Sequence, residues 1–260
     1  RAMEAVASLP VFSAFTTVLD FPEMDRVELE RSMSFQAKQY IPLPISEVAI
    51  DWLKIGDYED DKGFKHQQVL LISVPREYIE KYQRVFRMAG LRLKALEIEN
   101  LSLARVFSGD QTPTVVIDIG SQSTSISFLD RGQIKFISQS DFAGASLTQA
   151  LVNSLQINPL RAEELKRDRG ISTEATNYEL STIMPPFLDV IINEVKKAMY
   201  SYENRVQGAS KIERIALAGG GANLRGIEKY FKQDFDLPVM KANSFLGFEY
   251  QPEIEPLASE

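Results

Sequence analysis

The sequence predicts a mixed α/β protein, of the α/β or α+β class, made of two domains. Three observations support this: alternating helices and strands over 23–91, three short strands between 114 and 137, and a strand followed by three glycines and a helix over 214–231. A length of 260 residues suits two domains, because one domain usually holds roughly 100–200 residues.

Composition narrows the class of protein. A content of 44% hydrophobic and 25% charged residues is typical of a soluble globular protein, and no apolar run approaches the roughly 18 residues that span a bilayer. The net charge of −7 opposes undirected binding to nucleic acid or anionic lipid. The absence of cysteine excludes disulfides and fits a reducing compartment, so we expect a cytoplasmic protein. The chain opens without Met or a signal-peptide pattern, which predicts a fragment.

The segment 23–91 predicts a small module with the order α-β-β-α-β, its two helices packed on an antiparallel sheet. The periodicities and the turn residues define its five elements: a helix over Met24–Gln39, strands over Val48–Ile55 and Gln68–Val74, a helix from Pro75 to Gly90, and a strand over Leu91–Ile98. The acidic stretch 57–66 reads as a long loop in which His66 is solvated, and Trp52 belongs to the core or rim of the module.

The second half opens with an apolar strand that ends at Asp118 and Gly120. After a polar run the chain alternates again over Thr124–Leu129 and Ile134–Ile137, which predicts a three-stranded meander. A tight hairpin after an aspartate gathers backbone N–H groups beside a carboxylate, an arrangement that suits phosphates and a magnesium-bound water. An ordinary polar turn explains the same residues, so both interpretations stay open.

Two helix starts follow. Gly144 opens a helix whose free N–H groups suit a nucleotide, although a plain helix start explains this segment equally well. The next helix runs from Pro159 to Gly170. On it Glu163 and Lys166 share a face, either to bracket a ribose and an adenine edge or as a solvated ion pair.

Three consecutive glycines, Gly219 to Gly221, connect the strand 215–218 to a helix carrying Leu224 and Ile227. Glycine costs roughly 0.5–1 kcal/mol against alanine in regular structure, so three in a row indicate positive φ or close approach of a ligand. A flat ring is the expected occupant, and a bare tight turn is the alternative. The spacing does not match the G-x-G-x-x-G pattern of dinucleotide folds.

This order of motifs resembles the nucleotide domain of the actin, Hsp70 and sugar-kinase superfamily, which has a ribonuclease H-like fold. Three stretches, 42-PLPISEVAIDW-52, 73–105 and 118-DIGSQSTSI-126, resemble the PilM family of type IV pilus assembly, which is itself similar to the cell-division protein FtsA. The resemblance implies an actin-like fold with an inserted FtsA-type 1C subdomain. It assigns 1–22 and 92–112 to subdomain 1A, 23–91 to 1C, and 113–260 to the nucleotide-binding domain, which is 2A with a 2B insertion at roughly 150–205.

The resemblance also implies ATP or ADP with Mg²⁺ as cofactors, with Asp118 holding the metal through water. The expected nucleotide-binding residues are Asp118, Gly120, Ser121, Gln122, Ser123, Thr124, Gly144, Ala145, Glu163, Lys166, Gly219, Gly220, Gly221, Ala222 and Asn223. The family's first phosphate hairpin and closing helix are missing, so we expect a fold truncated at both ends and weakened binding of magnesium and the β- and γ-phosphates. Glu97 and Glu99 are weak candidates for the water-orienting residue, so the protein is at most a slow ATPase.

As to function, the resemblance implies a cytoplasmic ATP-binding scaffold of the type IV pilus assembly platform at the inner membrane, reached through partners. It would take up the N-terminal tail of a PilN-type membrane protein in a groove built from the expected strand Leu9–Leu19 and the sheet around Val69–Pro75. The expected groove residues are Phe15, Thr17, Leu19, Leu71 and Ser73. Other platform proteins are further expected partners, and nucleic acid is not. Two alternatives stay open: a small-molecule kinase of the same superfamily and a nucleotide-free secretion-platform protein.

Overall fold

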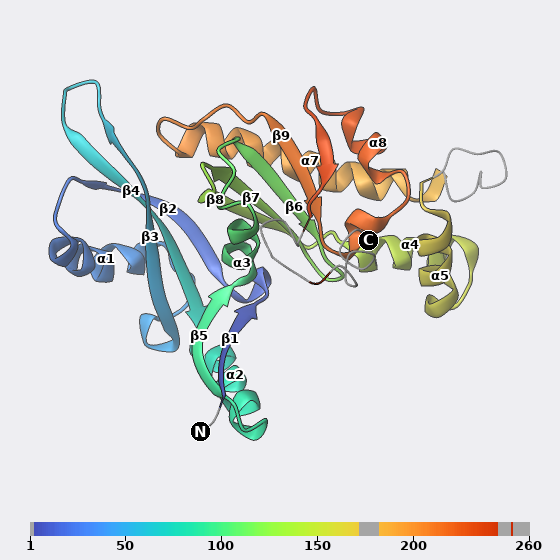
Figure 1. Cartoon of the computed structure of the whole chain (residues 1–260), viewed down its shortest axis with the longest axis horizontal. Coiled ribbons are helices and arrows are strands. Elements are labelled where there is room, and N and C mark those ends of the chain that lie inside the picture. Colours follow the sequence, from blue (N-terminus) through green and yellow to red (C-terminus); the bar gives the residue numbers. More distant parts are fainter. Residues whose placement is uncertain (1–2, 172–181, 244–250, 252–260) are drawn as a thin grey trace.

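The structure is a computed structural model that describes residues 3–171, 182–243 and 251 (Figure 1). The strands are β1 (Glu4–Leu9), β2 (Phe15–Pro22), β3 (Val48–Glu59), β4 (Lys65–Pro75), β5 (Arg92–Ile98), β6 (Thr114–Ile119), β7 (Thr124–Asp130), β8 (Gln133–Ser140), β9 (Arg214–Ala218) and β10 (Val239–Lys241). The helices are α1 (Arg26–Tyr40), α2 (Arg76–Met88), α3 (Glu99–Val106), α4 (Gly144–Leu155), α5 (Pro159–Arg169), α7 (Pro185–Arg205) and α8 (Ile227–Lys232). Along these residues no helix is long and apolar enough to cross a membrane.

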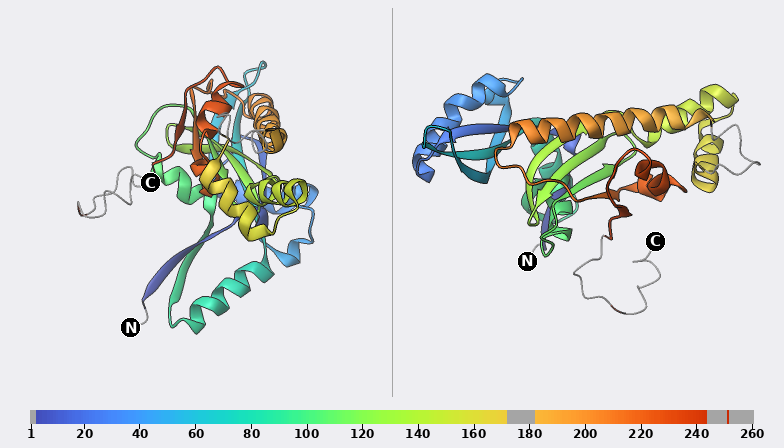
Figure 2. Two further views of the ribbon diagram at one scale, coloured as in Figure 1. Left: turned by 90° about the vertical axis from the view of Figure 1, so that its right-hand side faces the viewer. Right: turned by 90° about the horizontal axis from the view of Figure 1, so that it is seen from above.

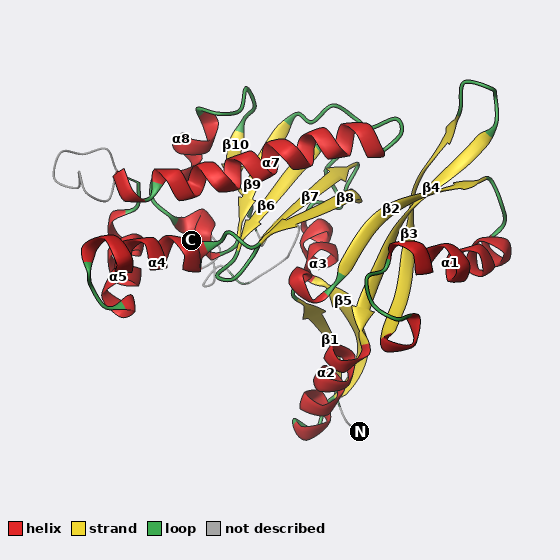
Figure 3. Ribbon diagram, turned by 180° about the vertical axis from the view of Figure 1, so that it is seen from behind, coloured by secondary structure: helices red, strands yellow, loops and turns green. Residues whose placement is uncertain are grey.

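A five-stranded sheet with the order β10-β9-β6-β7-β8 forms the centre of the second half. The predicted meander is confirmed, because β6, β7 and β8 pair antiparallel, while β9 pairs parallel with β6. Alternate residues of these strands pack on α4 and α7, and the other face packs on α3, so the sheet is covered on both sides (Figure 3). This two-sided burial suits the mostly apolar strands β6 and β9, while the polar residues of β7 that it buries, such as Ser125 and Ser127, are small.

A second sheet, of three strands in the order β2-β4-β3, carries α1 on one face. The helices and strands predicted over 24–90 are present, and Trp52 packs partly buried against the core under α1. The predicted strand 91–98 does not join this sheet, however. It forms β5 and pairs parallel with β1, and β2 takes the open edge beside β4 instead.

The expected continuous strand Leu9–Leu19 is wrong. β1 ends at Leu9, and the chain turns through a short 3-10 helix, η1 (Val11–Ser13), before β2 begins. Pro10 imposes this break, because its φ is held at −63° and it has no N–H for a sheet ladder. The Ser13 N–H and hydroxyl both donate to the Pro10 carbonyl, at 3.0 and 2.6 Å, and stabilise the turn.

The acidic stretch 57–66 is also different from its prediction as a long loop. The β3 and β4 strands continue to Glu59 and Lys65, so the connection is short. His66 lies in β4 and is not a solvated loop residue: its ring stacks on Tyr58 with centroids 5.0 Å apart, and its Nε2 lies 3.2 Å from Asp60 Oδ2. Cross-strand pairing of these side chains extends the hairpin.

Gln68 joins the three-stranded sheet to the end of α7. Its buried side-chain amide donates to Asp20 Oδ1 at 2.7 Å and to the Arg205 carbonyl at 2.9 Å, and its Oε1 accepts from the Gln207 N–H at 2.8 Å. The other end of α7 lies beside α4 and α5, on the far side of the molecule (Figure 2). The 21 residues of α7, about 30 Å long, therefore run from the three-stranded sheet to the α4 and α5 pair.

We expect Gln68→Leu to lower the free energy of unfolding by about 2–4 kcal/mol, because it removes three hydrogen bonds, two of them to the backbone at the end of α7. Urea denaturation measures this loss. Gln139→Leu, on an exposed position of β8, is the matched control. Equal, small losses for both variants would contradict the role of Gln68 as a junction.

Candidate functional site

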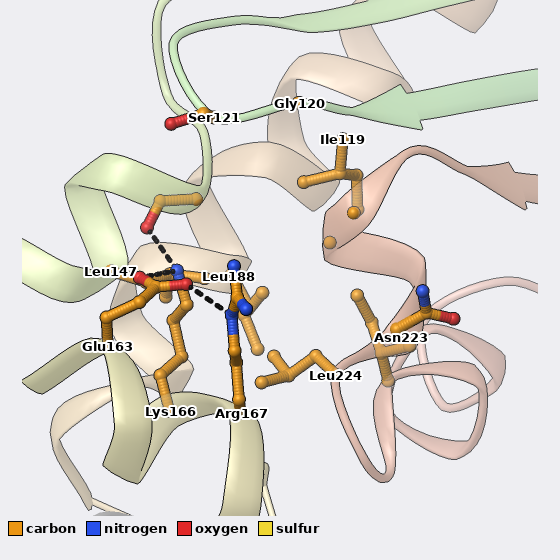
Figure 4. Close-up of a pocket in the computed structure, with 14 residues that line it drawn as sticks. Ile119, Gly120, Ser121, Leu147, Glu163, Lys166, Arg167, Leu188, Asn223 and Leu224 are labelled. Atoms are coloured by element: carbon orange, nitrogen blue, oxygen red, sulfur yellow. Dashed lines mark hydrogen bonds and ion pairs between the residues drawn. The ribbon is translucent and has the colours of Figure 1, made fainter.

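A cavity of about 600 Å³ opens where β6 ends, between the α4 and α5 pair and the turn after β9 (Figure 4). It brings together three motifs that are far apart in the sequence, and its polar and glycine lining consists of Gly120, Ser121, Gly144, Glu163, Lys166, Arg167, Gly220, Gly221 and Asn223. The apolar floor consists of Ile119, Leu147, Leu188, Leu224 and Ile227. An apolar floor with a few convergent polar groups is the usual character of a small-molecule site.

The three glycines after β9 have different roles. Gly219 adopts φ +76°, and a Cβ there would collide with the Asp118 carboxylate. Gly221 presses on Ile119, so a Cβ would lie 2.6 Å from that residue's Cβ. Gly220 has no atom within 4 Å of its would-be Cβ, because that side of the turn faces the cavity. Gly219 and Gly221 thus fit the interpretation as a tight turn, and Gly220 fits the interpretation as a place where a ligand approaches closely.

The turn continues as a 3-10 helix, η4 (Gly220–Asn223), and the regular helix α8 starts only at Ile227. The helix was expected to carry Leu224, which instead lies between the two. Ala222 is buried under the turn and does not line the cavity, whereas Asn223 does.

The loop 120–123 after β6 presents three backbone N–H groups. The Gly120 N–H donates to the Ser123 carbonyl at 3.0 Å, which closes the turn. No described residue accepts from the N–H groups of Ser121, Gln122 or Ser123. Successive free amides in a turn form a binding site for an anion. Thr124, in contrast, is buried and donates its hydroxyl to the Phe142 carbonyl at 2.7 Å, so it faces away from the loop opening.

The start of α4 corrects an expectation. The Gly144 and Ala145 N–H groups are not free for a nucleotide, because they donate to the Gly120 and Ser121 carbonyls at 2.9 and 2.8 Å. These bonds hold α4 against the loop. Gly144 still lines the cavity, and a Cβ there would lie 3.1 Å from the Gly120 carbonyl oxygen, so glycine allows this close approach.

Glu163 and Lys166 form a network with Thr148, not a solvated ion pair. Lys166 Nζ lies 2.7 Å from Glu163 Oε2, 2.9 Å from Thr148 Oγ1 and 3.0 Å from the Gly144 carbonyl oxygen, and its side chain is only 12% exposed. Thr148 donates to Glu163 at 2.6 Å, and Arg167 donates to the other carboxylate oxygen at 3.0 Å. Burial acts to raise the pKa of Glu163, but these donors and the charge of Lys166 outweigh it and lower the pKa to about 2.

We expect Lys166→Met to destabilise the protein by about 2 kcal/mol at pH 7, because it removes two hydrogen bonds and an ion pair. A carboxylate with a lowered pKa contributes stability above its unfolded pKa and loses it as the pH falls through its folded pKa. The effect should therefore shrink between pH 5 and pH 3. Lys197→Met is the matched control, since Lys197 and Glu194 form an exposed pair at the same i,i+3 spacing. Thermal unfolding of the parent protein and of each variant, at pH 7 and at pH 3, measures the loss of stability.

A second hollow, of about 290 Å³, lies on the other side of the loop and shares Gly120 and Ser121 with the cavity. Its remaining lining consists of Pro10, Phe12, Glu99, Asp118, Gln122 and Ser123. No described residue donates a hydrogen bond to the Asp118 carboxylate. Burial, and to a smaller extent repulsion from Glu99, raise the pKa of Asp118 to about 6. This hollow therefore combines two carboxylates with the three free amides.

Glu97 and Glu99 separate clearly. Glu97 belongs to β5, and its carboxylate accepts hydrogen bonds from Arg105 and from the Ser102 hydroxyl, which lower its pKa despite partial burial. Glu99 begins α3, accepts the Val11 N–H at 2.8 Å and lines the hollow with Asp118. The geometry brings Glu99 to the loop and leaves Glu97 outside it.

The expected partner groove is largely closed. Leu19 and Leu71 are buried in the core under α1, and Ser73 is buried on the same central strand. Phe15 pairs with Ser73 and Thr17 with Leu71, so these residues belong to one sheet and do not face each other across a gap. Only Phe15 and Thr17 keep partly exposed side chains, because β2 is the edge strand.

The site contains residues that sequence reasoning missed. Thr148 lies one turn after Gly144 on α4, and this spacing places its hydroxyl against the next helix. Arg167 follows Glu163 by four residues, which is a recognisable ion-pair spacing. Leu188 enters the cavity from α7, and only the tertiary structure brings it there.

The chain is similar to known proteins over most of its length. A family model described as "Type IV pilus assembly protein PilM" matches residues 1–258. The cell division protein FtsA of Enterococcus hirae is 24% identical over 194 residues, which are 65% of this chain and 43% of that protein. The chain thus spans less than half of this curated relative.

Solved structures agree on the fold. A PilM-PilN type IV pilus biogenesis complex matches all of this chain and 76% of its own, with a TM-score of 0.83 and 23% identity. MreB 5 of Spiroplasma citri bound to AMPPNP matches 64% of this chain and 60% of its own, with a TM-score of 0.51 and 19% identity. The predicted actin-like fold is confirmed by these similarities.

Proposed function

This chain belongs to the PilM family of type IV pilus assembly proteins, and we propose that it acts there as a scaffold that holds ATP or ADP and binds a PilN-type membrane protein. The supporting observation is that two hollows meet at the loop 120–123. The larger, apolar-floored cavity suits an adenine and a ribose, and the smaller one, with its free amides, suits a phosphate chain. MreB 5, which shares the fold, was solved with AMPPNP.

Within the larger cavity, Gly220 and Gly221 form the wall against which the base would lie, and Glu163 and Lys166 would contact the ribose and the base edge. Both charged side chains are held by Thr148 and Arg167, so little rotamer freedom remains to be lost on binding. In the smaller hollow, the Ser121, Gln122 and Ser123 amides would receive phosphate oxygens.

Magnesium fits the donor chemistry of the smaller hollow. Asp118 and Glu99 are oxygen ligands, the kind that Mg²⁺ prefers, and the half-buried Asp118 carboxylate has no cationic partner among the described residues. Among the described residues no group of three or more His, Cys, Asp or Glu side chains could hold a metal by itself. The ion would therefore need phosphate oxygens and water as further ligands, and it would supply charge neutralisation to the phosphates.

The partner site is proposed on β2, an edge strand of the three-stranded sheet that also approaches β8, with Phe15 and Thr17 as its partly exposed members. An edge strand presents unpaired backbone groups, so an extended tail can add to it with hydrogen bonds while alternate side chains give specificity. A match to a PilM-PilN complex supports a PilN-type partner for this chain.

Calorimetry of the purified protein with ATP and with ADP, each with magnesium or with EDTA, tests the nucleotide site. We expect saturable binding that magnesium strengthens, and no release of phosphorylated product when sugars are offered. Absence of binding would refute the nucleotide-holding scaffold and favour the nucleotide-free alternative.

The partner site is tested separately, by fluorescence anisotropy of a labelled partner-tail peptide. We expect saturable binding that Thr17→Pro abolishes.

A further inference from the structure

An arm made of β1, α2 and β5 projects away from the two larger sheets (Figures 1 and 2). The arm is basic in an acidic protein. Its three elements contain six basic and four acidic side chains, a net charge of +2, although the whole chain carries −7. Arg92 and Lys94 both pair with the Glu4 carboxylate, which offsets one of their two positive charges.

The last turns of α2 carry three basic residues without such a partner. Lys81, Arg84 and Arg87 are exposed, and none of them forms an ion pair with any residue that the structure describes. Attraction to the negative C-terminal end of the helix accounts for Arg87 in the last turn, but not for Lys81 and Arg84. It does not account for the apolar residues that lie among them.

Val85 and Met88 are those apolar residues, 55% and 82% exposed. Together with Lys81 and Arg84 they occupy positions i, i+3, i+4 and i+7 of the helix, which is one stripe. The inner stripe of α2 is a separate one, made of Tyr78, Ile79, Tyr82 and Phe86, and packs half-buried toward β4 and β5. The outer stripe, defined as Lys81, Arg84, Val85 and Met88 with Arg87 at its margin, therefore has no structural partner in the described chain.

We propose that this outer stripe docks on an anionic lipid surface. The basic side chains match the charge of anionic headgroups, and Val85 and Met88 can enter the boundary between headgroups and acyl chains. The negative net charge of the chain opposes undirected adsorption, so the arm would approach with one orientation. The contact would be weak and reversible, because so few apolar residues take part. It adds a direct membrane contact to the one that a membrane-anchored partner would provide, and it does not depend on nucleotide.

Co-sedimentation of the protein with vesicles of phosphatidylglycerol and phosphatidylcholine, compared with phosphatidylcholine alone, tests the proposal. We expect binding only to the anionic vesicles, weakening as salt rises. Arg84→Gln with Arg87→Gln should reduce partitioning about 25-fold, since each basic residue near the surface contributes about five-fold. Val85→Ser with Met88→Ser should also reduce it. The matched control is Lys229→Gln with Lys232→Gln in the last turn of α8, which should leave binding unchanged.

Circular dichroism of each variant verifies that α2 remains folded. Binding that the α8 control reduces as strongly as the α2 variants would overturn the proposal, as would the absence of binding to anionic vesicles. If an immobilised acidic peptide captures the protein through Arg84 and Arg87 while vesicles do not, the stripe is a protein-docking surface and the lipid assignment is wrong.

Discussion

Gly220→Val is expected to abolish nucleotide binding, with a loss of at least about 100-fold in affinity, while the protein stays folded. The position faces the cavity, and no protein atom lies within 4 Å of its would-be Cβ. The two methyl groups of valine would therefore occupy space proposed for the base and would not strain the fold. A loss of this size corresponds to about 2.7 kcal/mol of binding free energy. Calorimetry with ADP measures it.

Two further glycine variants make the result specific. Gly56→Val in β3 also points into open space, but far from the cavity, so it should leave both stability and binding unchanged. Gly221→Ala should instead destabilise the protein, because its Cβ would press on Ile119. Unchanged ADP affinity in a folded Gly220→Val protein would show that the base does not lie against this wall of the cavity.

Local pattern predicted the elements well and their long-range pairing poorly. The meander over 114–137 follows from alternation and short turns, so its strands could be placed from the sequence. The strand 91–98 was also recognised, but nothing in its residues indicates that it pairs with β1, almost ninety positions earlier. Pairing of this kind is set by the packing of whole layers, which periodicity does not encode.

The candidate site shows the same division. Gly220, Glu163 and Lys166 could be selected from the sequence because glycine runs and i,i+3 spacing have direct physical consequences. The hydrogen bond of the Gly144 amide could not be predicted from the sequence, because its acceptor, the Gly120 carbonyl, belongs to another turn. Glu97 and Glu99 differ in role because Glu97 lies within β5 and Glu99 opens α3.

Asp118→Asn is expected to stabilise the nucleotide-free protein at pH 8 and to remove the magnesium-dependent part of nucleotide affinity. Burial raises the pKa of Asp118 to about 6, from an ordinary value of 3.8, so the folded state disfavours the ionised carboxylate. A carboxyl with a raised pKa costs no stability below pH 3.8, and its penalty grows as the pH rises and is complete above pH 6. The asparagine variant should thus gain about 3 kcal/mol at pH 8 and almost nothing at pH 4.

The opposite signs of the two effects separate a cation site from a structural aspartate. A carboxylate that only shaped the turn would be stabilised by its surroundings, and its loss would weaken the fold. A carboxylate kept for a cation is unfavourable until the ion and the phosphates arrive, so magnesium with ADP should stabilise the parent protein much more than the variant. Denaturation at pH 4 and pH 8, with Asp168→Asn on the exposed face of α5 as the control, measures the first effect, and calorimetry with magnesium or EDTA measures the second. An Asp118→Asn protein that is less stable than its parent at pH 8, or that keeps the full magnesium effect, would show that Asp118 is not the residue that holds the ion.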